Sequence, residues 1–174
     1  CQEQPVEQVY LIAGNHDNFL ENRHYTIHKY LMGTKINYIE DSLCEYVDDN
    51  GKIWKIWGTP WCHIFGNWPF MRSSEVLTNK FSLIPEDIDI LLTHDPIFGY
   101  CDISRESKFN NKTHLGNKQL YKRLLNFNYN CVSICGHIHT GDKGPITFNN
   151  ITCYNASLLN ESYIKTFNPI LIKL

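Results

Sequence analysis

A short apolar segment that ends in histidines decides the fold class. Residues 131–139 read CVSICGHIH, five apolar or small residues followed by glycine and a His-x-His pair. A continuous apolar run bounded by glycine is typical of a strand that is buried on both faces of a sheet. The pattern therefore predicts a strand over residues 131–135 with two imidazoles just beyond its carboxyl end.

Two other segments repeat this arrangement. Residues 9–17 read VYLIAGNHD, and residues 88–96 read IDILLTHDP. Helical patterns occur over residues 19–31, 73–81 and 117–127. Alternating strands and helices predict an α/β fold, in which ligands bind beyond the carboxyl ends of the strands.

The remaining chain predicts antiparallel strands. Residues 44–57 alternate apolar and polar side chains around an Asp-Asn-Gly turn, and residues 146–154 have a similar pattern around Asn-Asn. Residues 170–174 favour a closing strand. Hairpins combined with α/β units indicate a mixed fold of two packed sheets flanked by helices.

Metal-ligating residue types follow all three predicted buried strands. A single histidine in such a place is more often structural, but three coincidences favour a site. The donors are neutral nitrogen and oxygen groups that suit divalent transition metals, namely Asn15, His94, His137 and His139. In an extended His-x-His pair the rings point to opposite faces, which suits a pair of ions.

Composition limits the class of protein. The chain has 174 residues, enough for one domain, and a formal net charge of -2, which disfavours nucleic acid as a partner. No apolar run approaches a membrane span. Seven cysteines show no paired spacing, so we expect reduced thiols and a cytoplasmic location. A small-molecule partner is expected, while the oligomeric state is left open.

The motifs resemble those of the calcineurin-like metallophosphoesterase superfamily. The matching segments are Gly14-Asn15-His16-Asp17, Thr93-His94-Asp95-Pro96 and Gly136-His137-Ile138-His139. Residues 58–61, 84–91, 154–157 and 168–170 are similar to a branch of small metallophosphoesterase-domain proteins. The resemblance implies an αββα sandwich and a metal-dependent phosphoesterase, acting on phosphodiesters such as cyclic nucleotides.

The resemblance also implies roles for individual residues. Asn15, His94 and His137 would hold one metal, and His139 would serve a second. His16 would be the catalytic histidine. The cofactors would be two divalent transition metals, such as Mn, Fe or Zn, in the complete protein.

Three further polar residues are expected to support the ligands or to contact substrate. Asp17 is expected chiefly to cap the following helix. Asp95 is expected chiefly to be a turn residue before Pro96, with orienting a ligand histidine or contacting substrate as alternatives. Asn155 belongs to the segment shared with the small-protein branch.

The family pattern also includes Asp-x-His and Gly-Asp-x-x-Asp, and neither occurs in the 174 residues. We therefore expect residues 1–174 to be a single metallophosphoesterase domain that lacks its N-terminal βαβ portion. The complete protein is then an enzyme, and the chain alone is inactive.

Several alternatives stay open. A nuclease of the same superfamily is disfavoured by the near-neutral charge, and a non-catalytic binding or scaffold protein of the same fold is the second functional hypothesis. His24 and His28 are interpreted as a solvated helix face. His63 could line the cleft but is expected to be a loop residue without a role.

Overall fold

The computed structural model describes residues 6–104 and 113–174. Its elements, in chain order, are β1 (Val9–Leu11), α1 (His24–Leu31), β2 (Ile36–Tyr38), β3 (Ser42–Val47), β4 (Ile53–Thr59), β5 (Cys62–His63), β6 (Met71–Arg72), α2 (Ser74–Ser82), β7 (Ile90–Thr93), β8 (Ile103–Ser104), β9 (Thr113–His114), α3 (Lys118–Leu124), β10 (Cys131–Cys135), β11 (Ile146–Phe148) and β12 (Ile151–Asn155).

A six-stranded mixed sheet forms the centre of the fold. Its strand order is β11-β12-β10-β7-β4-β3. The four inner strands are parallel to one another, and β3 and β11 close the edges as antiparallel strands. Both predicted hairpins are therefore confirmed, and the sequence-based expectation of a mixed α/β fold is correct.

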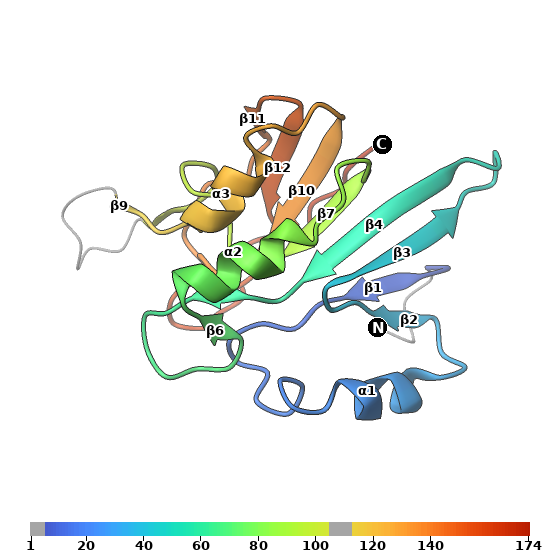
Figure 1. The fold of residues 1–174 in the computed structure, drawn as a ribbon, viewed down its shortest axis with the longest axis horizontal. Coiled ribbons are helices and arrows are strands. Elements are labelled where there is room, and N and C mark those ends of the chain that lie inside the picture. Colours follow the sequence, from blue (N-terminus) through green and yellow to red (C-terminus); the bar gives the residue numbers. More distant parts are fainter. Residues whose placement is uncertain (1–5, 105–112) are drawn as a thin grey trace.

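Helices α2 and α3 lie side by side over one face of this sheet (Figure 1). Each begins at a side-chain cap: the Ser73 side chain accepts from the amide of Val76, and Asn117 accepts from two amides of α3. Leu77 and Leu120 are fully buried on these helices. The apolar sides of the two helices thus cover the sheet and leave its carboxyl-end edge accessible.

The β1 strand differs from the prediction. It pairs in parallel with β2 in a separate two-stranded sheet, and Leu11 is 39% exposed, so it is not a strand buried on both faces. The pair nevertheless packs against β4 at Gly58, where an added Cβ would lie within 2.8 Å of Ile12 and Ile39. Glycine permits this close approach, which brings residues 13–15 to the main sheet.

Two other expectations are corrected. The helical stripe predicted over residues 19–31 forms only α1, because Arg23 has non-helical dihedral angles and turns precede it. Residues 170–174 form no strand in the structure, and Leu171 is 87% exposed without a pairing partner in the described chain.

The described cysteines are free thiols, and most of them are buried. Cys131, Cys135 and Cys153 are buried as small apolar side chains, and every cysteine among residues 6–104 and 113–174 is a free thiol. In the same residues, none of the helices has the length and apolar character needed to cross a membrane.

Candidate metal and phosphoesterase site

Strand register places His94 beside His137. Ile134 of β10 pairs with Leu92 of β7, so both strands end at the same level. The amide of Gly136 then donates to the carbonyl of His94, and the two imidazole centroids lie 4.6 Å apart. His137 has a φ of 64°, a left-handed conformation that is uncommon for histidine and is often found at functional sites.

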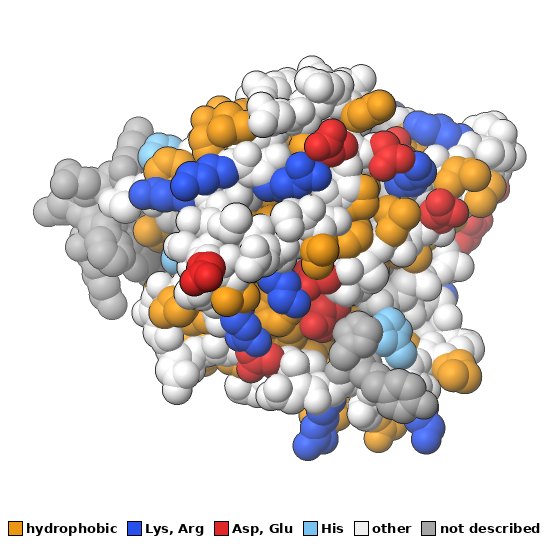
Figure 2. Space-filling view, viewed as in Figure 1, with side chains coloured by type: hydrophobic (Ala, Val, Ile, Leu, Met, Phe, Trp, Pro, Cys, Tyr) orange, Lys and Arg blue, Asp and Glu red, His pale blue; other side chains and the backbone are white. Residues whose placement is uncertain are grey.

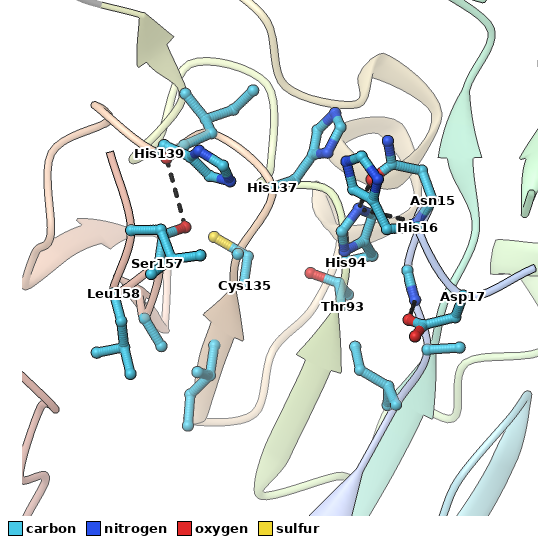
Figure 3. Close-up of a pocket in the computed structure, with 18 of the residues that line it drawn as sticks. Asn15, His16, Asp17, Thr93, His94, Cys135, His137, His139, Ser157 and Leu158 are labelled. Carbon is cyan, nitrogen blue, oxygen red and sulfur yellow. Dashed lines mark hydrogen bonds between the residues drawn. The ribbon is translucent and has the colours of Figure 1, made fainter. Parts of the chain in front are cut away.

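Asn15 joins this pair from the β1 side. Its Oδ1 atom lies 2.7 Å from Nε2 of His94. The backbone amide of Asn15 donates to the same Nε2 atom at 3.3 Å, so both the side chain and the main chain of Asn15 converge on this nitrogen. Gly14 makes the contact possible, because a Cβ there would lie 2.5 Å from Nδ1 of His94. Three predicted ligands, Asn15, His94 and His137, are therefore brought together (Figure 3).

Burial keeps both histidines neutral. Desolvation, followed by the neighbouring His137, lowers the pKa of His94 to about 3. Desolvation also lowers the pKa of His137, against the opposing effect of Asp95. Neutral imidazoles have a lone pair for a metal ion, so the electrostatic environment suits ligation.

His139 is held separately by the chain after β12. Its Nδ1 lies 2.9 Å from the carbonyl oxygen of Asn160. A carbonyl only accepts, so Nδ1 carries the proton and Nε2 presents the lone pair. Figure 3 shows His139 near Ser157, to one side of the group that contains Asn15, His94 and His137.

His16 lies exposed between two aromatic side chains. Its ring centroid is 4.9 Å from that of Trp68 and 5.8 Å from that of Tyr163. The Tyr163 hydroxyl is also 3.2 Å from Nε2 of His16. The ring is therefore oriented at the surface of the site while remaining accessible to a ligand.

All of these residues line one cavity of about 930 Å³. This volume is in the range of small-molecule sites. The cavity is mostly apolar in character apart from the convergent histidines, and Phe65 and Trp68 form part of its wall. It is a single site at the carboxyl-end edge of the sheet.

The pattern of residues in this cavity corresponds to a known family. Residues 2–141 match the calcineurin-like phosphoesterase family. The chain belongs to the calcineurin-like phosphoesterase family.

Relatives of this chain agree with the family assignment. Metallophosphoesterase domain-containing protein 1 of Homo sapiens is 28% identical over 188 residues, which cover 98% of this chain and 56% of that protein. UPF0046 protein C25E10.12 of Caenorhabditis elegans is 27% identical over 176 residues, covering 96% of this chain and 62% of that protein. The chain thus spans little more than half the length of these relatives.

One crystal structure shares the fold of this chain. It aligns with a TM-score of 0.61 at 16% identity and covers 85% of this chain and 56% of its own. The likeness supports the α/β sandwich architecture.

Calcineurin-like phosphoesterases generally use divalent metals, and the donors here fit part of such a site. Asn15 Oδ1 and the His94 and His137 imidazoles are neutral and convergent, with Asn15 buried and the two histidines partly buried. Within residues 6–104 and 113–174, no cluster of three or more His, Cys, Asp or Glu side chains has metal-site geometry. The described ligands therefore fit one side of an ion and leave its charge largely uncompensated.

Asp95 has a larger role than a turn residue. It is fully buried, and its Oδ2 accepts from Nδ1 of His63 at 3.0 Å and from Nδ2 of Asn117 at 2.9 Å. Its Oδ1 has no hydrogen-bond partner among the described residues and faces Nε2 of His137 at 3.8 Å. Burial by itself raises the pKa of Asp95, but His63 and His137 outweigh it, so the carboxyl is ionised.

The hydrogen bonds of Asp95 thus orient His63 and Asn117, while its 3.8 Å contact with the predicted ligand His137 is too long for a hydrogen bond. His63, which we interpreted as a loop residue without a role, is the side chain that sequence reasoning missed. The sequence did contain a signal for this contact, namely the His-Asp-Pro sequence after a buried strand. A carboxylate that is buried at such a place needs hydrogen-bond partners.

Asp17 and Asn155 act on the loops that bear the ligands. Asp17 does not cap a helix; its carboxylate accepts from the amide of Gly14 at 2.7 Å and closes the turn after β1. Asn155 is buried, and its Nδ2 donates to the carbonyl of Ile138 at 2.8 Å. That bond fixes the loop between His137 and His139.

His28 lies away from the candidate site. His28 is exposed on α1, with its ring 5.8 Å from that of Tyr38, and lines neither described cavity. The side chain of His24 lies outside the described residues.

Proposed function

We propose that the protein is a metal-dependent hydrolase of small phosphodiesters, of the cyclic-nucleotide type, with a two-metal centre. The observation that carries the proposal is the convergence of Asn15, His94 and His137 from three separate segments at the end of the sheet. His139 is the donor for the second metal. A metal bound there would act as a Lewis acid toward a phosphoryl oxygen.

The residues of the chain would bind and orient the substrate. His16 stands exposed at the cavity, where its Nε2 atom, shared with Tyr163, can hold or transfer a proton to the departing oxygen. Phe65 lies 5.2 Å from the His137 ring and helps to exclude water from the ligands. Trp68 presents an aromatic face to a ligand beside His16.

Surface charge favours a small substrate over a polyanion. On the face seen in Figure 2, Lys and Arg side chains alternate with Asp and Glu and form no continuous basic stripe. The formal net charge is -2. A nuclease would gain from a basic track along the nucleic-acid backbone.

The proposal is tested on the full-length protein with bis(p-nitrophenyl) phosphate and with a cyclic nucleotide. Hydrolysis should stop after chelation and return on addition of Mn²⁺. His137→Ala should lose both bound metal and hydrolysis, whereas the control His28→Ala should retain both. Hydrolysis that persists in excess chelator, or its absence from the metal-loaded protein, would contradict the proposal.

A further inference from the structure

A second cavity of about 470 Å³ adjoins the candidate site. His63 and Leu115 line both cavities, so the two cavities adjoin at these side chains. It lies between the β5–β6 region and the amino-terminal ends of α2 and α3. A ligand held at the site histidines could therefore extend past His63.

Several hydrogen-bond donors and cations line this second cavity, beside Ile64, Phe98 and Leu115. Its polar lining residues are His63, Arg72, Ser73, Ser74, His114, Lys118 and Gln119. No aspartate or glutamate is among the described residues that line it. Such a set favours an anionic group, and a phosphate can accept from several donors at once.

Buried carboxylates orient the two histidines from behind. Asp102 is buried, and its Oδ1 accepts from Nδ1 of His114 at 2.7 Å, while its Oδ2 accepts from the amides of Gly99 and Gly116. Asp95 holds His63 in the same way. The hydrogen bond to Asp95 also raises the pKa of His63 and favours its cationic form. In both rings Nδ1 is therefore held by a carboxylate, and Nε2 is the nitrogen that remains to contact a ligand.

The two permanently charged side chains of the cavity, Arg72 and Lys118, differ in how available they are to a ligand. Arg72 already pairs with Glu21 at 2.9 Å and stacks on Trp61. The Lys118 ammonium lies 5.0 Å from the centroid of the Phe98 ring. Among the described residues Lys118 has no carboxylate partner. It is the cation with the most capacity for a ligand.

We propose that the second cavity binds a second phosphate group of the substrate, through Lys118, His114 and His63. The inference rests on the proposed function, because it places the scissile phosphodiester at the site histidines. The preferred substrate class is then a phosphodiester that carries a further phosphate on its alcohol portion, rather than one with a single phosphate.

Two substrates that differ by one phosphate test this in the metal-loaded full-length protein. They are thymidine 5′-(p-nitrophenyl phosphate) and the same compound with a 3′-phosphate. The ratio of kcat/KM values should favour the second, and Lys118→Ala should lower that ratio about 10-fold, as expected for a charge-assisted contact. Lys122→Ala is the matched control, since Lys122 lies on the same helix but not in the cavity, and should keep the ratio.

A separate titration of the metal-free protein with inorganic phosphate distinguishes a substrate site from a site for free phosphate. Its readout is the ring proton resonances of His114 and His63. The proposal is supported if phosphate shifts the resonances of both histidines, if Lys118→Ala weakens these shifts, and if the kinetic preference is also observed. Shifts without any kinetic preference would assign the cavity to free phosphate and overturn the proposal.

The kinetic results also distinguish failure of the second-phosphate site from failure of the proposed function. Equal hydrolysis of both substrates by all three proteins would overturn the second-phosphate site alone. Failure of the wild-type protein to hydrolyse either substrate would overturn the proposed function and this site with it.

Discussion

Oδ1 of Asn15 and Nε2 of His94 lie 2.7 Å apart, although 79 positions separate them in the chain. Two atoms that both offer lone pairs approach so closely only when a proton or a cation lies between them. Either a proton on Nε2 or a bound metal ion can fill that place.

Removing either partner should therefore lower metal affinity. We expect Asn15→Ala and His94→Ala to weaken metal binding at least about 10-fold in the full-length protein. Metal content after dialysis, measured by mass spectrometry, checks this. The control Asn79→Ala changes an exposed amide on α2 and should leave the metal content unchanged. Wild-type metal content in Asn15→Ala would remove it from the ligand set.

His16 should affect turnover without affecting metal content. Its ring is exposed and is oriented by Trp68 and Tyr163, so its loss should not disturb the buried donors. We expect His16→Ala to lower kcat about 10²–10⁴-fold, the usual contribution of a proton-transferring group. Steady-state kinetics beside metal analysis decides the matter. A variant that turns over as fast as the wild type would exclude the catalytic role.

Gly14 should tolerate no side chain. A Cβ at this position would overlap the His94 ring, whereas one at Gly136 would meet only Ser157 Oγ, at 3.9 Å. We expect Gly14→Ala to lower the free energy of unfolding by about 1–3 kcal/mol and to weaken metal binding, because the ring must move. Chemical denaturation and metal titration measure the two effects. Gly136→Ala is the control, and equal behaviour of the two variants would contradict the packing argument.

Asp95 should set the tautomer of His63. Asp95→Asn keeps the size of the side chain but removes the ionised acceptor, so we expect the Nδ1–H form of His63 to lose its dominance. The free energy of unfolding should fall by about 1–3 kcal/mol. Nitrogen-15 NMR of the histidines measures the tautomer. Asp102→Asn should change His114 and leave His63 unaltered; a change at both histidines in either variant would show an indirect effect.

The local patterns predicted the strands that carry the ligands. Residues 90–93 and 131–135 are short apolar runs, and their parallel pairing brings His94 and His137 together as expected. The helical patterns over residues 73–81 and 117–127 were also reliable, and the caps at Ser73 and Asn117 that begin these helices depend on neighbouring residues only.

Contacts between distant segments were harder to predict. The placement of β1 depends on its pairing with β2 and on the contact at Gly58, neither of which leaves a local signature. The partners of Asp95 come from β5 and from the start of α3, 32 and 22 positions away. Residues 170–174 have a strand-like composition, but no neighbouring strand in the described chain is available to them.

The separation of β1 from the main sheet has a mechanical consequence. Asn15 belongs to the two-stranded layer, and His94 belongs to the six-stranded one. An ion shared by them would act as a cross-link that closes a long loop of chain and ties one layer to the other. Its removal should loosen the smaller layer first, so that amide exchange in residues 9–15 rises well before the larger sheet opens.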